Sequence, residues 1–154
     1  MDEKVILLIE DNQDDIALTL RAFKKCNILN TVIIIEDGQE ALDYISCKGK
    51  YEGKDPEDLP SVVLLDINLP KVNGFEILKA FRENETTKLL PVVFLTSSKE
   101  EQDIINGYLL GANSYIRKPV DFQNFFEAVK ALGLYWLIIN EPPKTSTKHE
   151  NKKY

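Results

Sequence analysis

Acidic residues follow two apolar runs of the sequence, and their types suit metal binding and phosphoryl chemistry. Glu10 and Asp11 come directly after the run Val5–Ile9, and Asp66 comes directly after the run Val62–Leu65. Carboxylate oxygens are ligands that Mg²⁺ prefers, and a carboxylate can also act as a nucleophile toward phosphorus. These residues favour a site for Mg²⁺ (or Mn²⁺) in which Asp66 accepts a phosphoryl group.

A hydroxyl and a lysine follow two further runs. Thr96 comes after Val92–Leu95, and Lys118 follows a fifth expected strand at residues 114–117. Lys118 would neutralise charge on the transferring group, and the Thr96 hydroxyl would bond to a phosphate oxygen only after transfer. Each of these residues alone is common in turns or at helix caps. Together, acids, a hydroxyl and a lysine at successive strand ends favour one functional site.

The elements that must position these residues alternate along the chain. The apolar runs are continuous and rich in β-branched residues, which is typical of strands buried on both faces of a parallel sheet. Between them lie segments with one apolar stripe at helical spacing, and Asp14 and Asp15 open the first of these helices, where acidic side chains favour the helix dipole. The order is (βα)₅, so right-handed crossovers predict an α/β, doubly wound, flavodoxin-like fold with a five-stranded parallel sheet in the order 2-1-3-4-5.

This topology brings the candidate residues to one edge of the sheet. Ligands of open parallel sheets bind where the strands end at their carboxyl side. The first and third strands are neighbours in this order, so Glu10, Asp11 and Asp66 are expected within a few ångströms of one another. Mutual repulsion of three carboxylates is costly unless a cation lies between them, and a hard divalent ion fits that need.

Composition limits the class of protein. The 154 residues suit one soluble domain, and the formal net charge of −6 disfavours nucleic-acid binding. The sequence has neither a secretory signal pattern nor an apolar run long enough to span a membrane, so a cytoplasmic protein is expected. The single histidine, His149, lies in the polar end of the chain, so the folded part offers no Ser-His or Cys-His catalytic pair.

The expected organisation is a domain of residues 1–139, with a long polar loop at 48–60, followed by a flexible polar tail of residues 140–154. An apolar run prolongs the last helix, and one buried face of that helix cannot cover all the apolar side chains of the run. One interpretation is that this run bends back over its own sheet. The other is a homodimer or partner interface, formed by Leu134, Tyr135, Trp136 and Ile138.

At these motifs the sequence resembles the receiver domain of response regulators over about residues 4–133. The resemblance rests on four segments, which are Ile9–Asn12, Leu65–Pro70 with Asn73-Gly74, Leu95–Ser98 and Tyr115–Pro119. It implies Asp66 as phosphoacceptor, with Glu10, Asp11 and the backbone carbonyl of Asn68 as further metal ligands. It also implies Lys118 as the counter-ion of the phosphate.

The resemblance carries further expectations for single residues. It implies Thr96 and Tyr115 as a switch pair, a cis peptide bond before Pro119, and a tight turn at Gly74 before the third helix. The long loop, Leu134–Leu137 and residues 140–143 resemble the corresponding segments of small single-domain regulators that are paired with phytochrome-type histidine kinases.

The function implied is a signalling phosphoacceptor, with no catalysis beyond self-phosphorylation from small donors and autodephosphorylation. Its phosphoryl donor would be a sensor histidine kinase or a phosphotransfer protein. Two alternatives remain. A pseudo-receiver scaffold would not accept phosphate, and an aspartyl-phosphate phosphatase would need an acid two residues after its nucleophile, where this chain has Asn68.

Overall fold

One parallel sheet organises the molecule. The computed structural model describes residues 4–97, 100–118 and 122–143. Five parallel strands pair in the order β2-β1-β3-β4-β5, which confirms the doubly wound topology predicted from the sequence. The strands and helices are β1 (Ile6–Ile9), α1 (Gln13–Lys25), β2 (Val32–Ile35), α2 (Gly38–Ser46), η1 (Gly49–Tyr51), β3 (Val62–Leu65), α3 (Gly74–Glu83), β4 (Val92–Thr96), α4 (Glu101–Leu109), β5 (Ser114–Arg117), α5 (Phe122–Leu134) and η2 (Tyr135–Ile139).

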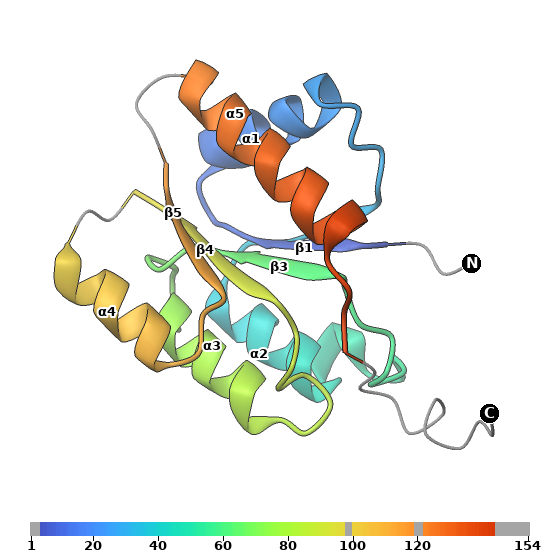
Figure 1. Ribbon diagram of the computed structural model, residues 1–154. Coiled ribbons are helices and arrows are strands. Elements are labelled where there is room, and N and C mark those ends of the chain that lie inside the picture. Colours follow the sequence, from blue (N-terminus) through green and yellow to red (C-terminus); the bar gives the residue numbers. More distant parts are fainter. Residues whose placement is uncertain (1–3, 98–99, 119–121, 144–154) are drawn as a thin grey trace.

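Helices cover both faces of this sheet. Figure 1 shows α1 and α5 on one face and α2 and α3 on the other, with α4 beside β5. Successive strand residues point to opposite faces, so each apolar run supplies two cores. In β1, Leu7 and Ile9 join the core under α2 and α3, while Ile6 and Leu8 join the core under α1 and α5. This double burial explains why the strands read as continuous apolar runs.

Asparagine caps begin the two helices that follow β1 and β3. The Asn12 side chain accepts a hydrogen bond from the backbone N–H of Asp15 at 3.1 Å, and the Asn73 side chain accepts one from the N–H of Glu76 at 3.1 Å. An N-cap of this kind satisfies a backbone donor that the helix itself leaves unpaired. The caps therefore fix where α1 and α3 begin, close to the edge of the sheet where the candidate residues lie.

The last helix changes its winding before it ends. The α5 helix passes at Tyr135 into a π-helical turn, and the Lys4 ammonium donates a hydrogen bond to the carbonyl of Leu137. Leu137 is buried and Trp136 packs partly against the same core, whereas Leu134, Tyr135 and Ile138 stay exposed. The run is thus partly packed against its own core, and the homodimer or partner interface stays a prediction.

The loop at 48–60 packs against α2. The Tyr51 hydroxyl donates a hydrogen bond of 2.6 Å to Glu40, and the Tyr51 ring meets the Tyr44 ring edge-on at 5.1 Å. The division of the chain at residue 139 stays a prediction, because residues 144–154 lie outside the described part. Within the described residues, no helix has the length and apolar character needed to cross a bilayer.

A glycine lets α3 approach the segment that follows β3. The N–H of Gly74 donates to the carbonyl of Ile67 at 2.8 Å. A Cβ atom built on Gly74 would lie 2.2 Å from the backbone oxygen of Asp66 and 2.8 Å from Cα of Ile67. Both atoms belong to backbone, which cannot move aside without shifting Asp66.

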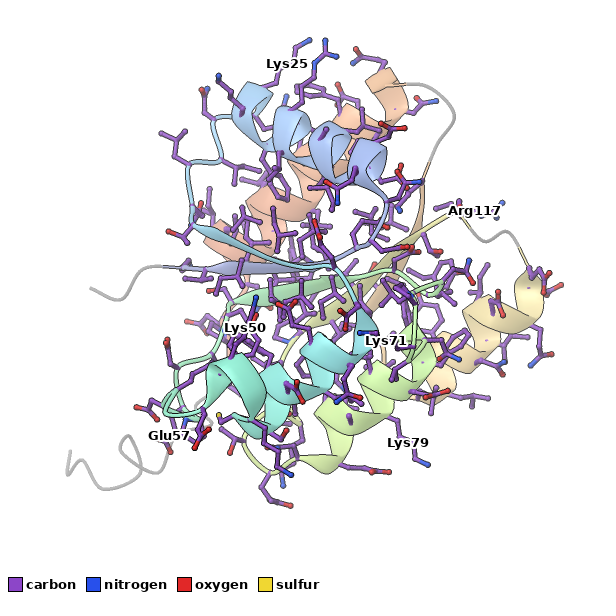
Figure 2. The ribbon with its side chains drawn as sticks, turned by 180° about the vertical axis from the view of Figure 1, so that it is seen from behind. Lys25, Lys50, Glu57, Lys71, Lys79 and Arg117 are labelled. Atoms are coloured by element: carbon purple, nitrogen blue, oxygen red, sulfur yellow. The ribbon has the colours of Figure 1, made fainter. Side chains whose placement is uncertain are left out.

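We therefore predict that Gly74→Ala lowers the free energy of unfolding by about 2 kcal/mol or more, because overpacking of this kind costs about 1–3 kcal/mol. Urea unfolding of the variant and the wild type measures the difference. The matched control is Lys79→Ala on the same helix, where the side chain projects into solvent (Figure 2) and the change should stay within about 0.5 kcal/mol. Equal stability of Gly74→Ala and Lys79→Ala would contradict the close approach.

Candidate functional site

Three carboxylates meet at the carboxyl edge of the sheet. Ile9 at the end of β1 pairs with Leu65 at the end of β3, and the N–H of Asp66 donates to the carbonyl of Ile9 at 3.0 Å. The residues that follow these strand ends are therefore level with each other. Glu10, Asp11 and Asp66 each offer an oxygen, and these oxygens lie within 4.8 Å of one another.

The carboxylates differ in their access to water. Glu10 is 2% exposed and Asp66 is 8% exposed, whereas Asp11 is open to solvent. Buried carboxylates are costly to ionise unless they have cationic or hydrogen-bonding partners. A site with two buried carboxylates and one exposed carboxylate is reachable from solvent on one side and favours a cation between its oxygens.

One buried ammonium already lies beside this cluster. The side chain of Lys118 is 7% exposed, and its Nζ donates hydrogen bonds to Glu10 Oε1 and to Asp15 Oδ2, the latter at 2.9 Å. The same Nζ lies 4.0 Å from Asp66 Oδ2, which is an ion-pair distance and too long for a hydrogen bond. One positive charge thus faces several negative charges.

The two oxygens of Asp66 have different surroundings. The backbone N–H of Ile67 donates a 2.9 Å hydrogen bond to Oδ1, while Oδ2 is the oxygen on the side of Lys118. A carboxylate held by its neighbour's backbone has little freedom to rotate. Asp66 therefore presents an oriented carboxylate to the site.

Burial and charge shift the acidity of the site residues. Burial raises the pKa of Glu10 from 4.5 to about 7, with the hydrogen bond from Lys118 opposing the rise and the charge of Asp66 adding to it. Burial alone would lower the pKa of Lys118, but the hydrogen bond to Glu10, the charge of Asp66 and the hydrogen bond to Asp15 outweigh it and leave this pKa raised. Lys118 therefore keeps its charge at neutral pH.

The remaining predicted residues lie on or next to the neighbouring strands. Thr96 ends β4 and is fully buried, and its carbonyl accepts a 2.7 Å hydrogen bond from the N–H of Lys118. Tyr115 in β5 is half-buried and packs against the ring of Phe94 at a centroid distance of 5.8 Å. Asn68 lies exposed two residues after Asp66. Pro119 lies outside the described residues, so the cis peptide bond stays a prediction.

Asp15 is a site residue whose contact the sequence analysis missed. The sequence relates Asp15 only to the dipole of α1, yet its carboxylate binds Lys118. The sequence places Asp15 in the first turn of a helix that begins two residues after Asp11, which puts it near the site but does not indicate its partner. The contact itself depends on the helix phase that the Asn12 cap sets.

The donor set fits a hard divalent cation. Such ions take oxygen ligands, and Mg²⁺ in particular keeps several waters while one or two carboxylates hold it. Glu10, Asp11 and Asp66 could each supply one oxygen, and the exposed side of Asp11 leaves room for water. No soft ligand, cysteine or histidine, belongs to this group of acids.

The family now follows from comparison with known proteins. Residues 6–130 match the response regulator receiver domain. The chain belongs to this family. The family is one of signalling proteins, and the fold and the acidic cluster agree with that membership.

Several relatives match this chain over most of their length. It is 37% identical to the response regulator Rcp1 of Synechocystis sp. over 134 residues, which is 87% of this chain and 89% of Rcp1. It is also 37% identical to a probable methanogenesis regulatory protein, FilR2, of Methanothrix harundinacea, over 142 residues, which is 92% of this chain and 89% of FilR2. Its relatives thus include a response regulator and a probable methanogenesis regulatory protein, each matched over most of its length.

Solved structures of relatives have the same fold. The crystal structure of the phosphorylated cyanobacterial phytochrome response regulator RcpA superposes with a TM-score of 0.84 at 36% identity, and the match covers 93% of this chain and all of RcpA. The Mn²⁺-bound form of Rcp1 superposes with a TM-score of 0.82 at 36% identity, covering 92% of this chain and 99% of Rcp1. Phytochrome response regulators are thus among its structural relatives.

The raised pKa of Glu10 predicts that protons compete with the cation. Because this pKa is higher in the folded chain than its ordinary value of 4.5, protonation of Glu10 stabilises the metal-free fold at low pH, and that contribution is lost as the pH rises through about 7. We expect Mg²⁺ to bind at least about ten-fold more weakly at pH 5.5 than at pH 7.5, as measured by titration calorimetry.

The control for this prediction is Glu10→Gln, which removes the titrating group but keeps its shape. Its Mg²⁺ affinity should be weaker at pH 7.5 and should change much less between the two pH values. Equal Mg²⁺ affinity of the wild-type protein at pH 5.5 and 7.5 would contradict the role given to Glu10.

Proposed function

We propose that this protein is a phosphoacceptor switch, in which Asp66 takes a phosphoryl group from a phosphohistidine of a partner protein. The observation that carries the proposal is the oriented carboxylate of Asp66 beside the ammonium of Lys118 and within 4.8 Å of two further acids. Mg²⁺, or Mn²⁺ in its place, would be held by Glu10, Asp11, Asp66 and the backbone carbonyl of Asn68.

The chemistry is an in-line displacement at phosphorus. An oxygen of Asp66 forms a new bond to phosphorus while the bond between phosphorus and the imidazole nitrogen of the donor breaks. The imidazole leaves with the electron pair of that bond and takes a proton from solvent. The bound cation would neutralise charge on the phosphoryl oxygens, which is the chemistry that it adds to the site.

The protein's own residues orient and balance this step. The N–H of Ile67 holds one oxygen of Asp66, so the carboxylate does not have to be reoriented for attack. Lys118 lies close enough to Asp66 Oδ2 to meet the oxygens of an incoming phosphoryl group, and it carries its charge at neutral pH. Acceptance of the group thus depends on positioning and charge rather than on a general base.

The donor is proposed to be a sensor histidine kinase, or a phosphotransfer protein, of the phytochrome type. The matched domain contains no histidine, which favours a phosphohistidine on a partner protein as the donor. The phytochrome assignment is supported by the similarity to RcpA, which is a phosphorylated phytochrome response regulator. The Mn²⁺ bound to Rcp1 supports the choice of metal.

The output is proposed to run through Thr96 and Tyr115. A phosphoryl group on Asp66 would draw the Thr96 hydroxyl toward it, and Tyr115 would turn into the space that this movement leaves. Tyr115 is half-buried between Phe94 and Gly107 of α4, so a change in its rotamer would alter the packing of that helix. The surface formed by α4, β5 and α5 is then the switched surface. Structures with and without a phosphate mimic that share one Tyr115 rotamer would end this mechanism.

The two alternatives from the sequence receive less support. A phosphatase would need a proton-transferring acid near the attacked group, and the residue two positions after Asp66 is the amide Asn68. A pseudo-receiver would be expected to lack one of the chemical groups, whereas the acids and the lysine lie together here. Both alternatives make different predictions in the experiment below.

The test is to incubate the wild type and Asp66→Asn with acetyl phosphate, with and without Mg²⁺, and to weigh the intact proteins. We predict a mass increase of one phosphoryl group in the wild type with Mg²⁺ and none in Asp66→Asn or in EDTA. Asp14→Asn is the matched control, because it removes an exposed carboxylate of α1 without touching the cluster, and it should be phosphorylated like the wild type. An unmodified wild type, or equal modification of Asp66→Asn, would refute the proposal. Rapid hydrolysis of a phosphate monoester would favour the phosphatase instead.

A further inference from the structure

The Lys118 ammonium is shared between two elements of the site. It bonds to Glu10, which follows β1, and to Asp15, which belongs to the first turn of α1, while Asp66 Oδ2 lies 4.0 Å away without a hydrogen bond. An ammonium has three N–H donors, so the two carboxylates already occupy two of them. The acceptor Asp66 does not hold the lysine in this state.

Asp15 is well placed to hold Lys118 on the side of α1. Its backbone N–H is fixed by the Asn12 cap at 3.1 Å, and its carbonyl accepts a 2.8 Å hydrogen bond from the Thr19 hydroxyl. Its side chain is 32% exposed while that of Lys118 is 7% exposed, so the pair lies at the margin of the core. Water screens such a pair only in part, and the bond is charge-assisted on both sides.

We propose that Asp15 is a positioning residue, which holds Lys118 in the unphosphorylated arrangement and so opposes the phosphorylated one. The inference rests on the proposed function, because it concerns how Lys118 divides its charge between Asp15 and a phosphoryl group on Asp66. Both carboxylate and phosphoryl oxygens accept from the same ammonium, and they compete for its charge. Strong binding to Asp15 therefore weakens the interaction of the Lys118 ammonium with the phosphoryl oxygens.

A second effect acts in the same direction. Phosphorylation adds negative charge to Asp66, as phosphoryl groups carry about −1.5 to −2 at neutral pH. Asp15 Oδ2 lies 2.9 Å and Asp66 Oδ2 lies 4.0 Å from the same ammonium nitrogen, so the Asp15 carboxylate is near enough to repel that added charge. Removal of the Asp15 charge relieves the competition and the repulsion together.

The role of Asp15 differs from that of Glu10, although both bind Lys118. Glu10 belongs to the acidic cluster that would hold the cation, so a bound cation neutralises its charge in the active state. Asp15 does not belong to that cluster and keeps its charge when the cation is present. With the cation bound, Asp15 is therefore the carboxylate that still draws Lys118 toward α1.

The test measures the affinity of the protein for beryllofluoride, a phosphoryl mimic, in saturating Mg²⁺ by ¹⁹F NMR. We expect Asp15→Asn to bind the mimic roughly three- to ten-fold more tightly than the wild type, which corresponds to the loss of one partly screened, charge-assisted hydrogen bond. The control Asp14→Asn removes the same charge from the same helical turn and should bind the mimic like the wild type. Asp15→Glu, which restores the charge, should return the affinity toward the wild-type value.

The outcomes separate this inference from the proposed function. Affinity in Asp15→Asn that equals that of Asp14→Asn, or falls below it, would overturn the positioning role while wild-type binding of the mimic upholds the phosphoacceptor. A wild type that binds no mimic in Mg²⁺ would overturn both. Urea unfolding of the three variants guards against a general loss of structure, which would weaken binding and so cannot produce the expected gain.

Discussion

The structure depends on how a few buried charges are balanced at one edge of the sheet. Glu10 and Asp66 are almost fully buried, Asp11 and Asp15 lie at the margin, and one ammonium, that of Lys118, lies among them. Carboxylates this close together repel each other strongly once water is excluded. The site tolerates this charge because Lys118 bonds to Glu10 and Asp15 and lies 4.0 Å from Asp66, and because the cluster is open to a cation on its exposed side.

The sheet makes this balance possible and keeps it rigid. Paired ends of β1 and β3 bring Glu10 and Asp66 to the same level, and the backbone hydrogen bond from Asp66 to Ile9 fixes their separation. The close approach of Gly74 to the backbone of Asp66 leaves no space for the acceptor segment to shift. The proposed mechanism therefore leaves the acceptor segment in place and assigns the movement to the side chains of Lys118, Thr96 and Tyr115.

Much of this arrangement could be predicted from the sequence, and the reasons are physical. Strands buried on both faces must be apolar at every position, so their runs and their ends are visible in the sequence, and strand order then places Glu10, Asp11 and Asp66 together. The contact of Asp15 with Lys118 could not be predicted in this way, because it depends on the helix phase that the Asn12 cap sets. The π-helical turn at Tyr135, in which Leu137 is buried and Ile138 is exposed, was equally hidden, because the apolar run alone does not reveal a change of winding.

The central claim is that Asp66 carries the phosphoryl group while Lys118 and a divalent cation share its charge. A crystal structure of the protein with Mg²⁺ and beryllofluoride tests this claim most directly. We predict beryllium bonded to one oxygen of Asp66, Mg²⁺ held by Glu10, Asp11, Asp66 and the carbonyl of Asn68, and Lys118 bonded to a fluoride. Beryllofluoride bound elsewhere, or Mg²⁺ bound away from these acids, would contradict it.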